Sequence, residues 1–83
     1  MRKYGPLHAH LSKRDGRPAM LAFEEIEIII GDALPASAHS KRSSFWANDY
    51  AGHHPHAQAW MRAGYRVAFV DPEDGFVRFE RLH

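Results

Sequence analysis

The stretch YRVAFVDPEDGFVRFERL, residues 65–82, decides the expected fold. Residues 65–70 and 76–82 each alternate apolar and polar side chains, a pattern that predicts two β-strands. The segment between them, residues 71–75, contains Pro72 and ends in Gly75, which is typical of a turn. The two strands are therefore expected to form a C-terminal β-hairpin.

The alternation also predicts which side chains of the hairpin share a face. Successive residues of a strand point to opposite sides, so Tyr65, Val67 and Phe69 are expected on one face of the first strand. Val77 and Phe79 are expected together on the second strand, with the charged residues between and after them on the opposite face. The hairpin thus offers one apolar face to a core.

Upstream of the hairpin the sequence predicts short helices and one short strand. Apolar spacing, glycines and prolines predict a helix over 7–12, a strand over 19–23, a helix over 23–30 that stops at Gly31, a short helix over 36–39, and a helix over 56–63. This order matches a winged helix, in which the helix before the hairpin is presented to a DNA groove. We expect one α+β domain over residues 1–83, winged-helix-like, with short helices packed on a small antiparallel sheet.

Composition limits the possible classes of protein. The chain has 83 residues, 45% of them hydrophobic and 25% charged, as in ordinary globular domains. It contains no cysteine, which excludes disulfides, and no apolar run long enough to span a membrane. A cytoplasmic location is expected. The net charge of +1 hides basic segments at 1–18 and 33–66 and acidic ones at 19–32 and 67–83.

A joint pattern in the chain resembles a family of small bacterial domains of uncharacterised function. The pattern is F-x-E-I-E, then G-x-x-L-P-x-S-A, W-A-N, H-x-Q-A-x-A-W-x-x-A-G-Y/W-x-V and a closing V-x-F. The chain departs from it in the run His54-Pro55-His56, where Ser and His are expected, and it has Phe45 where a second aromatic often precedes W-A-N. The resemblance covers nearly the whole chain. It implies stand-alone short proteins or modules beside nuclease-like domains, which suits nucleic-acid binding.

The segment between Lys41 and Arg62 contains the candidate binding residues. Asparagine and glutamine can bond adenine, and arginine can bond guanine or phosphate, so Asn48, Gln58 and Arg62 are candidates to contact bases. Histidine and serine can hold phosphates. The predicted nucleic-acid-binding residues are Lys41, Arg42, Ser43, Ser44, Trp46, Asn48, His54, His56, Gln58 and Arg62. Double-stranded DNA is the favoured partner, and a homodimer reading two half-sites is possible.

Each of these residues also has a structural interpretation. A tryptophan in a small domain is more often core than a platform for a base, so Trp46 and Trp60 are candidates for burial. Asn48 is a candidate to cap or turn the chain, and Gln58 and Arg62 to face water. The acidic turn at 71–75 also differs from the basic wing of most DNA binders.

Metal binding and catalysis are less favoured. His53, His54 and His56 with Asp49 offer ligand atoms, but neighbouring histidines rarely reach one ion and a zinc-site spacing is missing. Exposed histidines would instead gain charge below about pH 6.5, which would make His54 and His56 better phosphate ligands in mild acid. The sequence contains no G-x-S-x-G, Gly-rich phosphate loop or H-E-x-x-H motif. No cofactor and no enzymatic activity are expected.

The alternative function is a protein-interaction or self-association module. The acidic helix over 24–30 offers a surface for a basic partner or for a second copy of the chain. Under this alternative the segment 41–62 is only part of the core.

Overall fold

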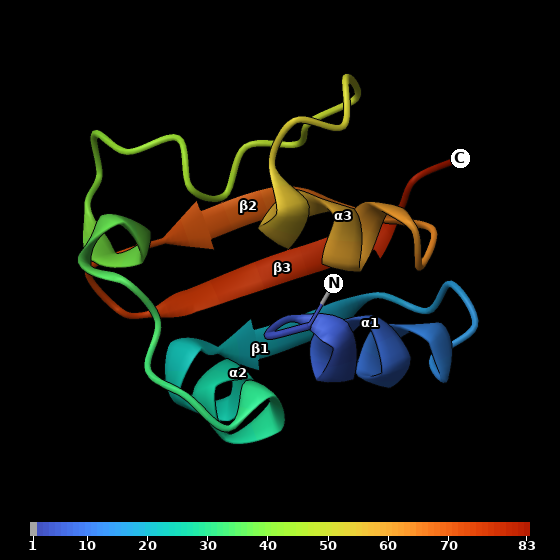
Figure 1. The fold of residues 1–83 in the computed structure, drawn as a ribbon, viewed down its shortest axis with the longest axis horizontal. Coiled ribbons are helices and arrows are strands. Elements are labelled where there is room, and N and C mark those ends of the chain that lie inside the picture. Colours follow the sequence, from blue (N-terminus) through green and yellow to red (C-terminus); the bar gives the residue numbers. More distant parts are fainter. Residues whose placement is uncertain (1) are drawn as a thin grey trace.

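A computed structural model describes residues 2–83 of the chain. It confirms an α+β fold in which short helices accompany a three-stranded antiparallel sheet that ends in a hairpin (Figure 1). The elements are α1 (Gly5–Ser12), β1 (Ala19–Ala22), α2 (Phe23–Ile30), the 3-10 helix η1 (Ala36–His39), α3 (Pro55–Met61), β2 (Tyr65–Asp71) and β3 (Phe76–Arg81). Among residues 2–83 no helix is long and apolar enough to cross a membrane.

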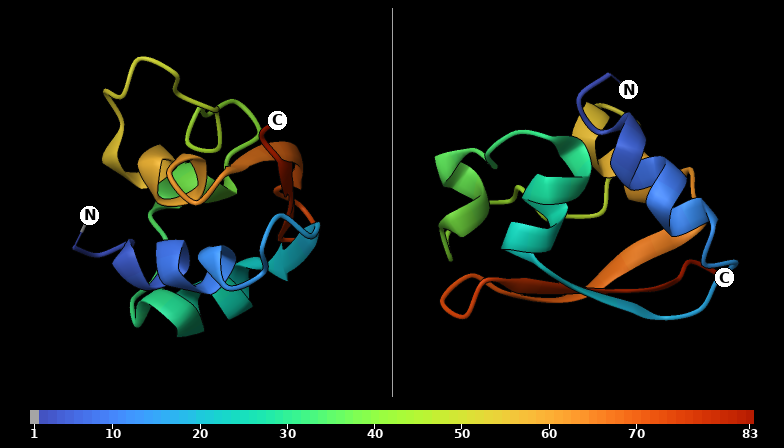
Figure 2. Two further views of the ribbon diagram at one scale, coloured as in Figure 1. Left: turned by 90° about the vertical axis from the view of Figure 1, so that its right-hand side faces the viewer. Right: turned by 90° about the horizontal axis from the view of Figure 1, so that it is seen from below.

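The sheet has β3 at its centre, with β1 and β2 as its two edges. Leu21 of β1 lies opposite Val77, and Val67 of β2 lies opposite Phe79, so apolar residues of all three strands meet on one face. The helices pack on that face and leave the other face uncovered (Figure 2). The fold therefore has two layers and a single-sided sheet.

The core lies between the helices and the sheet. The pairs Leu7–Leu11 of α1 and Ile26–Ile30 of α2 are each one helical turn apart and point inward, as their spacing predicted. Trp60 of α3 is 1% exposed and is among the largest fully buried side chains. The core also contains Phe23, Trp46, Ala57, Tyr65, Val77 and Phe79.

The ends of α2 follow from local chemistry. Gly31 takes a left-handed φ of 71° and its N–H donates to the carbonyl of Glu27, so the predicted glycine stop is confirmed. At the other end the Glu25 carboxylate accepts the N–H of Ala22 at 3.0 Å. Helix α3 begins one residue earlier than predicted, with Pro55 in its first turn, and ends at Met61.

The predicted face of β2 is wrong at Phe69. The register between β2 and β3 shifts between Val67 and Phe69, which marks a bulge at Ala68. The extra residue reverses the alternation, so Tyr65 is fully buried whereas Phe69 is 53% exposed. Val70 packs against the core instead.

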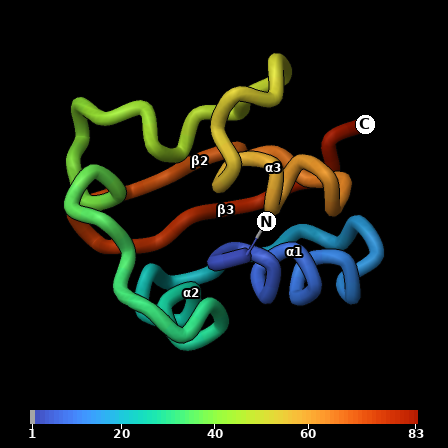
Figure 3. The backbone as a smooth tube through the Cα atoms, in the orientation of Figure 1, coloured from blue at the N-terminus to red at the C-terminus, as the bar shows by residue number. Residues whose placement is uncertain are grey.

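The order of elements agrees with the predicted order, but the connection between α2 and α3 is long. Residues 31–54 separate the two helices and carry η1, whereas a helix-turn-helix unit joins its helices by a short turn. This connection passes the end of the sheet where the hairpin turns, and then returns along β2 to α3 (Figure 3). The likeness to a winged helix therefore stays a prediction.

Replacing Trp60 tests the packing of the core. We expect Trp60→Ala to lower the free energy of unfolding by about 3–5 kcal/mol, because it empties a site between α3 and the sheet. The measurement is urea unfolding followed by circular dichroism. Phe69→Ala is the matched control and should change stability far less, because its ring is half-exposed beyond the bulge. Equal losses in the two variants would contradict the described placement of both rings.

Candidate nucleic-acid interface

Residues 41–62, called the central segment below, contain all ten predicted binding residues. The segment leaves η1, follows the outer edge of β2 and enters α3 (Figure 1). Its path brings some of these side chains into the fold and leaves others on the surface. The two groups have different chemistry.

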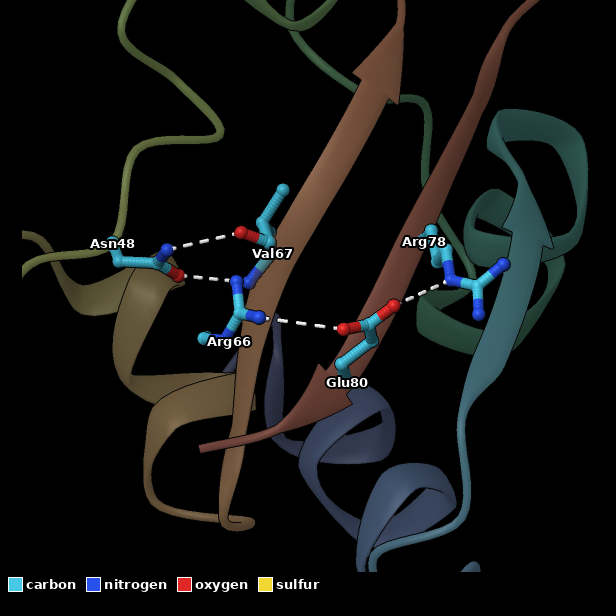
Figure 4. Close-up of polar contacts among 5 residues, drawn as sticks. All are labelled: Asn48, Arg66, Val67, Arg78 and Glu80. Carbon is cyan, nitrogen blue, oxygen red and sulfur yellow. Dashed lines mark hydrogen bonds and ion pairs between the residues drawn. The ribbon is translucent and has the colours of Figure 1, made fainter. Parts of the chain in front are cut away.

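Asn48 fixes the central segment to the edge of the sheet. Its Nδ2 donates to the carbonyl of Val67 at 3.1 Å, and its Oδ1 accepts the N–H of Val67 at 2.8 Å (Figure 4). The same Oδ1 accepts the indole N–H of Trp60 at 3.0 Å. Because β2 is an edge strand, Val67 has no neighbouring strand on that side, and the asparagine amide takes the place of one.

Trp46 belongs to the core rather than to the surface. It is 6% exposed, and its indole N–H donates to the carbonyl of Ala38 at 3.0 Å. Its ring lies between Phe23 and Trp60, with centroid distances of 5.4 Å and 5.7 Å. These contacts agree with the core interpretation of both tryptophans and leave Trp46 without an open face for a base.

The surroundings of His56 favour its neutral form. Its Nε2 lies 2.7 Å from the carbonyl oxygen of Phe45, which can only accept, so Nε2 carries the hydrogen. The imidazole stacks on the Phe45 ring at a centroid distance of 4.1 Å. Burial lowers the pKa of His56 below 6.5, although the bond to Phe45 acts in the opposite direction. His53 and His54 are exposed, whereas His56 is half-buried.

The loop before α3 uses Asp49 and Gln58 for its own support. Gln58 Nε2 donates to the backbone carbonyl of Asp49 at 3.1 Å. The Asp49 carboxylate accepts the backbone N–H groups of Ala51 and His54. Desolvation opposes ionisation, but these backbone bonds prevail and lower the pKa of Asp49 below 3.8. The only acidic side chain of the central segment therefore faces the loop backbone.

The remaining predicted residues lie at the surface in two places. Lys41, Ser43 and Ser44 line a cleft of about 320 Å³ with Trp46, next to Val70 and Pro72 of the hairpin. Gln58 and Arg62 line a second, smaller cleft with Gly52 and Pro55. Lys41 forms an ion pair with Glu73 in the hairpin turn. Arg42 and His54 are exposed.

The structure also shows surface residues that the prediction did not include. Tyr50 is 75% exposed in the loop between Asn48 and α3. The signal was present in the sequence, because an aromatic residue among Asp, Gly and Pro has few apolar neighbours to cover it. Among residues 2–83 no three His, Cys, Asp or Glu side chains lie together as metal ligands would.

Comparisons with known proteins give one family. A family model described as a domain of unknown function (DUF7662) matches residues 4–81. No curated protein and no solved structure matches the chain.

Removing the Asn48 amide should destabilise the fold. We expect Asn48→Ala to lower the free energy of unfolding by about 2–3 kcal/mol, because an unpaired polar group at a covered site costs about 1–3 kcal/mol. Asn48→Asp keeps the acceptor for Trp60 and the Val67 N–H but places an oxygen against the Val67 carbonyl, so it should also be destabilising. Urea unfolding measures both. Two variants within about 0.5 kcal/mol of wild type would show that the amide does not hold the segment.

The neutral state of His56 should make stability depend on pH. The unfolded chain binds this proton more tightly than the folded chain, because the folded pKa lies below 6.5. The contribution of His56 is therefore fully present above pH 6.5 and is lost as the pH falls toward the folded pKa. We expect His56→Gln, whose amide can still donate to Phe45, to lose less stability than wild type between pH 7 and pH 5. Identical losses in urea unfolding would contradict this assignment.

Proposed function

The chain belongs to the family DUF7662, whose function is unknown, and we propose that it binds nucleic acid through the central segment. The observation that carries the proposal is which side chains of the segment are used inside the fold and which are exposed to solvent. Its two tryptophans, Phe45 and its amide groups are used inside the fold, whereas its arginines and Tyr50 face solvent. Among residues 2–83 neither Arg42 nor Arg62 forms an ion pair.

Charge supports contact with phosphates. Asp49 is the only carboxylate of the segment, and its oxygens are turned to the loop's own N–H groups. The exposed charges that remain free are those of Arg42 and Arg62. Neutralising phosphates with such side chains supplies most of the affinity of non-specific nucleic-acid binding.

The engaged amides favour phosphate contact over base contact. Asn48 and Gln58 hold backbone groups at 3.1 Å or less, so their use on a base would require the loop to give up its own support. In this proposal Ser43, Ser44 and Lys41 add phosphate ligands from the first cleft. Affinity would then depend little on base sequence.

Duplex DNA is the favoured partner because of where α3 lies. In a winged-helix arrangement the helix before the hairpin enters the major groove, and here that helix is α3. Gln58 of α3 and Arg62, the residue that follows its last turn, both line the second cleft. The acidic hairpin turn opposes binding at its own position, although Lys41 partly neutralises it through Glu73.

The alternative is a protein-interaction module, and Ile28 is the observation that favours it. This side chain is 81% exposed on α2, one helical turn after Glu24. A single exposed apolar residue is common on soluble proteins, so it carries less weight than the unpaired arginines.

Substituting both arginines tests the nucleic-acid proposal. Labelled random duplex DNA is titrated in fluorescence anisotropy at about 50 mM and about 200 mM salt. We expect the double variant Arg42→Ala, Arg62→Ala to bind more weakly at low salt, and the slope of log K against log salt to fall by about one for each lost phosphate contact. The single variant Arg78→Ala, which removes an exposed arginine from the uncovered face of the sheet, is the matched control.

The outcomes separate the two functions. Weaker binding in the double variant with normal binding in Arg78→Ala supports the central segment as the interface. Absence of duplex binding by wild type at low salt, or equal effects in both variants, overturns the proposal. The fold of each variant is checked by its thermal unfolding.

A further inference from the structure

The face of the sheet that points away from the helices is not covered by any of them (Figure 2). Met20, Arg78 and Phe69 lie opposite one another across the three strands. Met20 is 57% exposed and Phe69 is 53% exposed. These two apolar side chains stand on either side of Arg78, and exposed apolar side chains gathered on one face often mark a binding site.

Two aromatic rings stand together on this face. Phe76 of β3 is the diagonal neighbour of Phe69, and the ring centroids are 5.8 Å apart at an interplanar angle of 45°. Phe69 reaches this position only because the bulge in β2 turns it outward. A ring that contributes little to the core and is half-open to solvent is free to stack on another flat group.

The same face carries Arg66 and Arg78, which both donate to the carboxylate of Glu80. Glu80 accepts from Arg66 at 3.3 Å and from Arg78 at 2.7 Å (Figure 4). Glu80 offsets one of the two positive charges, and the carboxylate of Asp71, opposite Phe76 on β2, accepts the backbone N–H groups of Glu73 and Asp74. Each guanidinium gives one donor nitrogen to Glu80, whereas a guanidinium has five N–H donors in total. Donors therefore remain available for a second anion.

We propose that this open face binds single-stranded nucleic acid, with bases on the rings of Phe69 and Phe76 and phosphates at Arg78 and Arg66. Aromatic rings on a sheet with adjacent arginines are the groups that bind unpaired strands. Each base has a flat face that can stack on a ring, and each phosphate linkage carries a negative charge that an arginine can bind. A duplex keeps its bases stacked inside and cannot use the rings. An apolar protein partner would cover arginine donors without supplying acceptors for them.

This surface is distinct from the central segment. The arginines proposed to contact duplex DNA come from residues 41–62, whereas the rings, Arg66 and Arg78 come from β2 and β3. The two proposals can therefore fail independently, and one set of variants separates them.

The test uses the whole chain and a labelled oligo(dT) strand of about 12 nucleotides in fluorescence anisotropy. We expect Phe69→Ala to weaken binding of the strand by about tenfold, since losing one base-stacking ring costs a factor of this order. Arg78→Ala should weaken it and reduce its salt dependence. Phe69→Tyr keeps a ring and should bind normally. The double variant Arg42→Ala, Arg62→Ala should lose less strand binding than Phe69→Ala does, because the base-stacking rings remain.

Three results would overturn the inference. The first is absence of oligo(dT) binding by wild type at about 50 mM salt. The second is strand binding that survives Phe69→Ala but is lost in the Arg42, Arg62 double variant, which would assign both nucleic acids to the central segment. The third is a wild-type dimer in sedimentation that dissociates in Phe69→Ala, which would make the face a contact between two copies of the chain. Thermal unfolding confirms that Phe69→Ala remains folded.

Discussion

The side-chain amide of Asn48 is the contact on which the rest of the structure depends. An edge strand leaves backbone donors and acceptors without a partner, and a loop as long as residues 31–54 loses much conformational entropy when it is fixed. The Asn48 amide pairs with both the N–H and the carbonyl of Val67. These two hydrogen bonds satisfy the edge strand and also fix the loop. The bond between Asn48 and Trp60 connects the same point to the core.

This arrangement determines what the surface can bind. Amides and indoles that could have contacted bases are used to hold the loop, so apart from Tyr50 the exposed side chains are mainly arginines, serines and histidines. Such groups attract phosphates but discriminate poorly between bases. A small chain without disulfides has few other means of fixing a long loop, and polar side chains that support the loop are not available to contact bases.

The sequence predicted the parts of the fold that depend on local patterns. Alternation gave the hairpin, the spacing of Leu7 and Leu11 gave a helix, and Gly31 gave a helix end. The bulge at Ala68 could not be predicted, because Val67 to Val70 are all apolar, so the pattern does not show which of them face the core, and only pairing with β3 reveals the extra residue. The role of Asn48 could not be predicted for a similar reason. Its partners Val67 and Trp60 are distant in sequence, whereas periodicity describes only neighbouring residues.

The bulge and the Asn48 contact occupy the same short part of β2, and this proximity links the two proposed surfaces. Asn48 holds Val67 on the outer edge of the strand, and the register shifts immediately after Val67. A bulge increases local twist and redirects the next side chains. The contact that places the central segment is therefore next to the irregularity that turns Phe69 away from the core. A regular strand would direct Phe69 inward, where Val70 now packs, and the open face would lose its most exposed ring.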